Sequence, residues 1–201
     1  MNAQHQCNQV TVVGIMESDF AFSHDFSGEK FYTATLAVER MSGTKDYLPI
    51  TVSEKLIDSK CTYVGHPVCV IGQFRSYNQK DGTHKHLILN IFAQDFYITA
   101  AQDMNDISLQ GYLCKIPTYR VTPKGRQIAD LMLAIPRPNG KSDYIPCVLW
   151  GRDAVFASQL IVGTQVSIDG RIQSREYTKM VHDVPHIKTA FEVSISKIQR
   201  V

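Results

Sequence analysis

Basic and aromatic side chains share one face of a β-like segment in the second half of the chain. The segment TQVSIDGRIQSREY (164–177) places Arg171, Arg175 and Tyr177 an even number of residues apart, which puts them on one face of an extended strand. The single tryptophan, Trp150, ends a second such segment, DYIPCVLW. Aromatic rings stack on bases while arginines contact phosphates, so this combination suits the binding of a single nucleic-acid strand.

The same alternation separates a predicted core from a predicted binding face. In DYIPCVLW the residues Ile145, Cys147 and Leu149 share one apolar face, which leaves Tyr144 and Trp150 on the other. The residues predicted on the outer, nucleic-acid-binding face are Trp150, Tyr177, Arg171, Arg175, Tyr112 and Tyr144. A lone tryptophan is more often a core residue, and that alternative stays open, as does an ordinary solvated role for the two arginines.

Basic side chains also gather in the segments that flank these strands. KIPTYRVTPKGR (115–126) and YTKMVHDVPHIK (177–188) are predicted to be loops, and Arg152 follows directly after the tryptophan. Their predicted nucleic-acid-binding residues are Lys115, Tyr119, Arg120, Lys124, Arg126, Arg152 and Lys179. Plain solvated surface is the alternative for both loops.

The elements that position these residues occur twice. Gly14 and Gly111 lie 97 residues apart, and the same spacing separates Asp46-Tyr47 from Asp143-Tyr144. A unit of roughly 95 residues is therefore duplicated. The polar segment TAAQDMND (99–106) is the predicted linker, which gives domains at 1–103 and 104–201.

Each unit consists mainly of strand-like segments with one short helical segment. SEKLIDS is the helical segment of the first unit and RDAVFASQL that of the second, and each falls between the third and fourth strands. This is the element order of an OB-fold. We therefore expect an all-β protein with two tandem five-stranded OB-fold barrels.

The second unit resembles a known family. Its segment CVLWGRDAVFASQLIVGTQVSIDGRIQSREY is similar to the centre of bacterial single-stranded DNA-binding proteins, through Trp150-Gly151-Arg152, the turn 162–164 and the run 175–177. The resemblance implies a non-enzymatic protein of DNA replication, recombination or repair. A primosomal replication protein of the same OB class is the close alternative. Because the chain stops at SISKIQRV, we expect no acidic C-terminal tail of the kind that recruits partners in this family.

Charge and the missing tryptophan distinguish the two units. Residues 1–103 hold 8 Lys and Arg against 11 Asp and Glu, whereas residues 104–201 hold 13 against 8. Ser53 occupies the position that corresponds to Trp150, and it is predicted to face outward with Tyr47 and Thr51. The second unit is therefore the predicted nucleic-acid-binding half. In the first, Arg75 and Tyr77 offer a secondary patch, whereas Asp19 and Asp25 of the hairpin DFAFSHDF would repel phosphates.

The first unit is predicted to serve assembly. Val13, Ile15, Cys69 and Ile71 are apolar at outward positions, where a solvated barrel wall would be polar. We expect a homodimer with four OB-folds, because two-fold dimers are the commonest homo-oligomers. The alternative is a monomer whose two barrels bury this patch against each other.

Composition excludes several other classes. The chain is 44% hydrophobic and 20% charged, like a soluble globular protein, and no apolar run approaches the ~20 residues of a membrane helix. The polar start is no signal peptide, and five cysteines without a CxxC pair favour the reducing cytoplasm. No phosphate-binding, metal or hydrolase motif is present, so we predict no cofactor, metal or enzymatic activity. A protein-interaction module of replication and an RNA binder remain the alternative functions.

Overall fold

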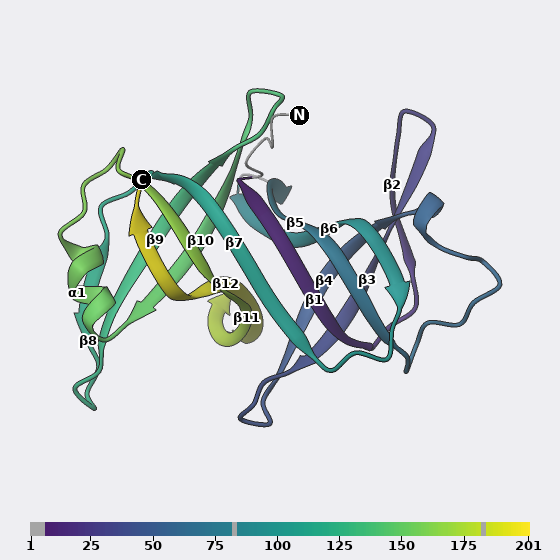
Figure 1. The fold of residues 1–201 in the computed structure, drawn as a ribbon, viewed down its shortest axis with the longest axis horizontal. Helices are drawn as coiled ribbons and strands as arrows, with labels where there is room; N and C mark the ends of the chain where they lie inside the picture. Colours follow the sequence, from purple (N-terminus) through teal and green to yellow (C-terminus); the bar gives the residue numbers. More distant parts are fainter. Residues whose placement is uncertain (1–6, 82–83, 182–183) are drawn as a thin grey trace.

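Five strands close into a barrel in each repeat, and the two barrels lie side by side (Figure 1). The computed structural model describes residues 7–81, 84–181 and 184–201. The first barrel contains β1 (Asn8–Met16), β3 (Glu29–Glu39), β4 (Lys45–Ser53), β5 (Pro67–Asp81) and β6 (His84–Ile98). The second contains β7 (Met104–Leu113), β9 (Gln127–Pro136), β10 (Ser142–Trp150), β11 (Gln165–Val181) and β12 (Val184–Arg200).

Both barrels close in the same way. β1 pairs with β3 and with β5, and β4 pairs with β6 in parallel, while all other pairs of the first barrel are antiparallel. The second barrel repeats this pattern with β7, β9, β11, β10 and β12. The predicted tandem OB-folds are confirmed, including a short helix after the third strand of each barrel: η1 (Glu54–Leu56) and α1 (Arg152–Ser158).

Each barrel interior is filled by the alternate apolar residues of its strands. Ile145, Cys147 and Leu149 of β10 are buried as predicted, and so are Ile168 and Ile172 of β11. On α1, two alanines face the barrel and are buried. Among the described residues, no helix has the length and apolar character needed to cross a membrane.

Three segments differ from the sequence-based expectation. β8 (Thr118–Val121) pairs with β9 inside a segment predicted as a loop, as β2 (Ala21–Phe26) pairs with β3 in the first barrel. β11 and β12 continue their ladder to Val181 and Val184, so the predicted loop 177–188 is the end of a long hairpin. β7 begins at Met104, which shortens the predicted linker. These polar segments lack alternation and gain their strand structure from backbone pairing.

A bulge in the fourth barrel strand occurs where the sequence places a glycine. The β11–β12 register shifts between Asp169 and Gly170, and a Cβ on Gly170 would lie only 2.3 Å from the Ser194 carbonyl oxygen. The Asn105 side chain continues the strand pairing beyond this point: its Nδ2 donates to the Ile172 carbonyl at 2.7 Å, and the Ile172 amide donates to its Oδ1 at 2.9 Å. Glycine therefore permits the close backbone contact that the bulge requires.

One continuous sheet connects the barrels. β1 and β7 pair antiparallel over six residues, with Val10 opposite Ile107. These two residues are 97 positions apart, the spacing of the repeat, so the pseudo-two-fold axis that relates the barrels passes between them. The contact is therefore isologous, like the interface of a symmetric dimer, but it lies within one chain.

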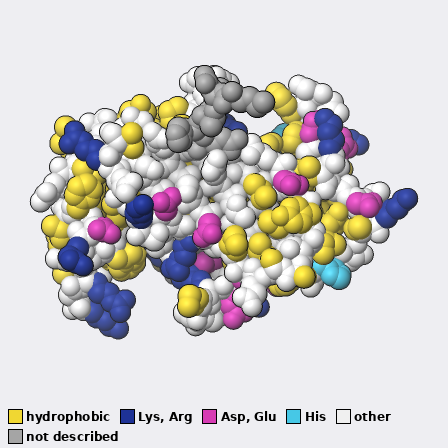
Figure 2. All heavy atoms as spheres, viewed as in Figure 1, with side chains coloured by type: hydrophobic (Ala, Val, Ile, Leu, Met, Phe, Trp, Pro, Cys, Tyr) yellow, Lys and Arg dark blue, Asp and Glu magenta, His cyan; other side chains and the backbone are white. Residues whose placement is uncertain are grey.

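The outer face of this sheet carries exposed apolar residues over the first barrel, with the exposed Asp95 opposite Ile71. Ile71 and Tyr97 are exposed there, and hydrophobic side chains gather on this face of the first barrel in Figure 2. Val13 and Cys69, which were predicted to be free to pack against another unit, are already buried. The cause is that Val13 lies in β1 between Cys69 of β5 and Met104 of β7.

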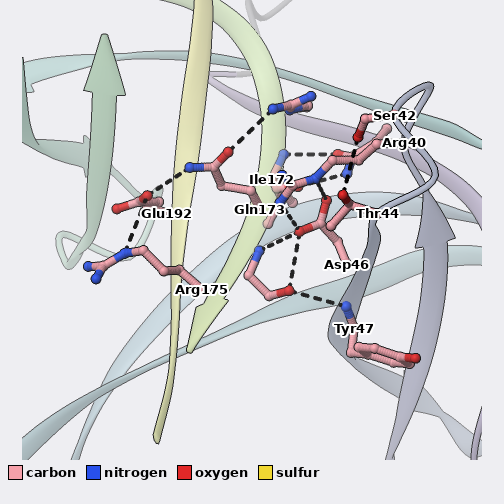
Figure 3. Close-up of polar contacts among 12 residues, drawn as sticks. Arg40, Ser42, Thr44, Asp46, Tyr47, Ile172, Gln173, Arg175 and Glu192 are labelled. Atoms are coloured by element: carbon pink, nitrogen blue, oxygen red, sulfur yellow. Dashed lines mark hydrogen bonds and ion pairs between the residues drawn. The ribbon is translucent and has the colours of Figure 1, made fainter. Parts of the chain in front are cut away.

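Two buried aspartates hold the barrels together across the sheet. Asp46 accepts hydrogen bonds from Arg40 Nε at 2.6 Å and from the Ser174 amide at 2.7 Å; we call this set the Asp46 clasp (Figure 3). Ser174 belongs to β11 and Asp46 to β4, so the bond joins the two barrels. The Tyr47 amide donates to Ser174 Oγ at 3.3 Å.

The second clasp is the symmetric counterpart of the first. Asp143 accepts from Arg137 Nε at 2.7 Å and from the Ser76 amide at 2.6 Å, and the Tyr144 amide donates to Ser76 Oγ at 2.7 Å. We call these residues the Asp143 clasp. Asp46 and Asp143 are 0% and 1% exposed. The repeated Asp-Tyr segment is therefore explained by a paired contact between barrels.

Candidate nucleic-acid interface

A groove of about 740 Å³ crosses the second barrel between β8 and β11. Trp150 lies in it, as do three basic residues from different elements: Lys115 after β7, Arg120 on β8 and Arg175 on β11. Val148 forms part of the apolar floor. The groove thus combines one large ring with three cations.

Trp150 is positioned by the end of β10. It is the last residue of that strand, opposite Ile128 of β9, and the Gly151 amide donates to the Gln127 carbonyl at 2.9 Å. Gly151 has φ of 66°, so the chain turns sharply into α1 directly after the ring. The Trp150 side chain is 44% exposed, which excludes the alternative of a core tryptophan.

The arginines of the groove are held beside carboxylates. Arg120 donates from Nε to Asp130 Oδ2 at 2.9 Å and from Nη2 to Oδ1 at 3.3 Å, and this pairing raises the pKa of Arg120. Arg175 Nε lies 4.0 Å from Glu192 Oε1, which also accepts from Gln173 Nε2 at 2.7 Å (Figure 3). The Arg120 and Arg175 side chains are 52% and 60% exposed. Such exposed ion pairs are weak, so a phosphate can compete for both guanidinium groups.

The structure brings four of the predicted residues together in this groove and places the others elsewhere. Tyr112 and Tyr144 are exposed and lie in register with Ala134 from either side, towards the opposite end of β10 from Trp150. Tyr177 is exposed on the long β11–β12 hairpin. Shared outward parity does not bring Tyr144 and Trp150 together, because six positions along β10 separate them by about 20 Å.

The remaining predicted residues surround the groove at its edges. Lys124 and Arg126 are exposed at the β8–β9 turn, Arg152 begins α1, and Tyr119 alternates with Arg120 on β8. Arg171 is half-buried and donates to Gln173 at 3.4 Å. The side chain of Lys179 lies outside the described part of the chain.

Three polar residues that lie beside the arginines of the groove were absent from the predicted site. Asp130, Gln173 and Glu192 line it, and each is bonded to, or lies beside, a predicted arginine. Alternation in IADLMLAI places Asp130 outward, so the strand pattern carried a signal for that residue. The partnership of Gln173 with Glu192 depends on the β11–β12 register, which periodicity alone does not give.

The first barrel uses the position of the tryptophan differently. Ser53 is 7% exposed, donates to Glu29 Oε1 and accepts from the Lys55 amide at 3.2 Å, so it is the N-cap of η1. Thr51 is also buried and accepts from Asn90 Nδ2 at 2.7 Å. The prediction that Thr51 and Ser53 are exposed was therefore wrong, because neighbouring side chains cover this wall of the first barrel.

No group of three or more metal-ligating side chains occurs within residues 7–81, 84–181 and 184–201. Burial raises the pKa of the Cys147 thiol beneath the groove. The arrangement therefore offers stacking and ionic contacts, and the described residues do not assemble a metal centre.

The fold and the groove together define a tandem OB-fold protein with an aromatic and basic face on its second barrel. Residues 104–201 match the model of the single-strand binding protein family. The predicted resemblance to bacterial single-stranded DNA-binding proteins is thereby confirmed, and the match lies in the second repeat.

Individual relatives match part of the chain. The chain is 37% identical over 81 residues to the single-stranded DNA-binding protein of Oceanobacillus iheyensis, which covers 37% of this chain and 50% of that protein. It is 41% identical over 81 residues to single-stranded DNA-binding protein 3 of Listeria innocua, which covers 37% of this chain and 51% of the relative. The chain thus spans about half the length of these relatives.

The wild-type single-stranded DNA-binding protein of Thermus aquaticus is similar in structure to the whole chain. The TM-score is 0.76 with 20% sequence identity, and the match covers 96% of this chain and 92% of that one. At this identity the likeness establishes the shared two-barrel fold.

Proposed function

We propose that this protein binds single-stranded DNA with little sequence preference and acts in DNA replication, recombination or repair. The observation that carries the proposal is the exposed Trp150 beside Lys115, Arg120 and Arg175 in one groove. The names of the relatives, and the family match of residues 104–201, support it. We place nucleic-acid binding mainly in residues 104–201 and assembly mainly in residues 1–103.

The groove can bind a strand without reading its sequence. A base stacks on Trp150, for which any of the four bases has a suitable face, and the adjoining phosphates contact Arg120 and Arg175. Val148 and Ile128 of the groove exclude water from one side of the stacked base. The same chemistry requires no bond cleavage, so we infer a binding protein rather than an enzyme. We also propose that it acts in the cytoplasm.

A titration tests this function. Fluorescent oligo-dT of about 30 nucleotides, long enough for two OB-folds, is expected to bind tightly at low salt and to weaken steeply as salt rises. Oligo-U and a DNA duplex of equal length serve as comparison ligands. Tighter binding of oligo-U would indicate an RNA-binding protein, and no binding of any ligand at low salt would instead favour a protein-interaction module.

We further propose that two chains associate through the apolar outer face of the first barrel. Ile71 and Tyr97 are exposed on that face, which also carries the half-buried Ile15. The barrels of one chain meet through the β1–β7 ladder and the clasps, and this leaves the face uncovered. A homodimer formed through this face would bring four OB-folds together and would leave the groove of the second barrel uncovered.

Ile71→Asp is expected to abolish this dimer, because it places a charge in the centre of an apolar contact. Light scattering at micromolar concentration should give twice 22.6 kDa for the unchanged chain and 22.6 kDa for the variant. Asp19→Asn on the exposed β1–β2 segment serves as the control. A mass of 22.6 kDa for the unchanged chain would contradict the dimer, and a dimer unaffected by Ile71→Asp would show that another surface is used.

A further inference from the structure

The two clasps differ in charge although the fold relates them by symmetry. In the Asp46 clasp one arginine, Arg40, neutralises the aspartate. In the Asp143 clasp two arginines face one carboxylate, because Arg75 Nη1 also lies 3.9 Å from Asp143 Oδ2 beside Arg137. In the second barrel the neutral Gln173 corresponds to Arg75. Each lies three residues after the glycine at which the strand register shifts, Gly72 in β5 and Gly170 in β11. The Asp143 side of the junction therefore carries one excess positive charge.

This excess charge is incompletely satisfied by the protein. Arg75 Nη2 donates to Gln73 Oε1, but the buried Arg75 Nε has no hydrogen-bond partner among the described residues, and the same holds for Arg171 Nε in the second barrel. Burial and the neighbouring Arg137 lower the pKa of Arg75. The two arginine side chains are partly buried, so an anion at this place would relieve both their desolvation and the repulsion between the two guanidinium groups.

A pocket of about 290 Å³ opens directly onto the two arginines. Both Arg75 and Arg137 line it, one from each barrel, together with Tyr77, Asn90 and Phe92 of the first barrel and His24 of the β2–β3 hairpin. Tyr77 is 51% exposed, whereas Phe92 is half-buried. The pocket thus adjoins cations on one side and aromatic rings on another.

The aromatic wall is ordered by a stack of rings. The His24 ring lies parallel to Phe31 at 5.0 Å between centroids, and Phe31 contacts Phe92 at 5.6 Å. The Arg75 guanidinium carbon lies 5.9 Å from the Phe92 ring centre. Cation–π contact and the aromatic stack hold Arg75 in place at the edge of the pocket.

We propose that this junction pocket binds one nucleotide unit of a single strand, with the phosphate on Arg75 and Arg137 and the base against Tyr77 and Phe92. A simple anion would need only the arginines, whereas the adjoining rings and the Asn90 side chain fit a base as well. The inference rests on the proposed binding of single-stranded DNA. It adds a second contact site, built by both barrels, in the half of the chain with net negative charge.

Arg75→Gln tests the proposal, because it installs the residue that the second barrel has at this position. Asp143 keeps Arg137 as its partner, so the variant should fold, and a thermal melt checks this. Binding is measured with oligo-dT of about 8 nucleotides, which the groove of the second barrel can accommodate alone, and of about 30 nucleotides, which spans both barrels. Lys60→Gln, an equal change of charge at an exposed position of the first barrel, is the matched control.

For Arg75→Gln we expect binding of the longer strand to weaken about tenfold, binding of the shorter strand to stay unchanged, and the salt dependence for the longer strand to fall by about one unit of slope. Arg75→Lys should retain the salt dependence while losing part of the affinity. If Arg75→Gln behaves like Lys60→Gln, or weakens both strands equally, the junction site is refuted while the proposed function stands. If the unchanged protein binds neither strand, both proposals fail.

Discussion

Asp143→Ala is expected to lower the free energy of unfolding by about 3–5 kcal/mol, the typical cost of removing one partner from a buried ion pair. The Asp143 carboxylate is buried and accepts hydrogen bonds from the Arg137 side chain and from the Ser76 amide of the other barrel. Its loss leaves two arginines near each other without a counter-charge, as well as an unpaired amide. Chemical denaturation followed by circular dichroism measures the effect.

Asp19→Ala is the control for this experiment, because Asp19 is an exposed aspartate of the first barrel. We expect it to change stability by less than about 0.5 kcal/mol, as surface substitutions usually do. A loss below about 1 kcal/mol for Asp143→Ala would show that the β1–β7 ladder joins the barrels without help from the Asp143 clasp.

Trp150→Ala is expected to weaken the binding of single-stranded DNA by about 1–3 kcal/mol, or roughly 5- to 150-fold, while leaving the fold intact. The reason is that the ring is 44% exposed at the end of β10, where it supports little of the core but offers a full face to a base. Fluorescence anisotropy with oligo-dT measures the binding, and a thermal melt measures the stability.

Tyr47→Ala provides a matched aromatic control. Tyr47 is exposed to a similar extent on β4 of the first barrel, outside both pockets described above. Its removal should leave binding nearly unchanged. If Trp150→Ala binds as tightly as the unchanged protein, base stacking in the groove of the second barrel is not the source of affinity.

Much of the fold could be predicted because the sequence repeats itself and alternates strictly. Ile145, Cys147 and Leu149 are buried, and Trp150 is exposed, as alternation in a single strand requires. The barrel architecture followed from the order of strands and helix, which depends only on local pattern.

The parts that could not be predicted depend on partners far away in the sequence. In the sequence Asp46 only marks the repeat, because its hydrogen-bond partner Ser174 lies 128 positions further along the chain. The repeat predicts Ser53 to be a lost stacking residue, whereas its contact with Glu29 and its capping of η1 give it a structural role. No periodicity in the sequence identifies such cross-strand and cross-barrel contacts.

The β1–β7 ladder has a consequence for behaviour on dilution. Because both strands belong to one polypeptide, the tether keeps their effective local concentration high at any protein concentration. Two-barrel units should therefore persist at nanomolar concentration, where contacts between separate chains dissociate. Covalent linkage also allows the two barrels to differ in sequence, whereas the barrels of a homodimer are identical. One barrel could then acquire Trp150 and the other Arg75 without either change appearing twice in the assembly.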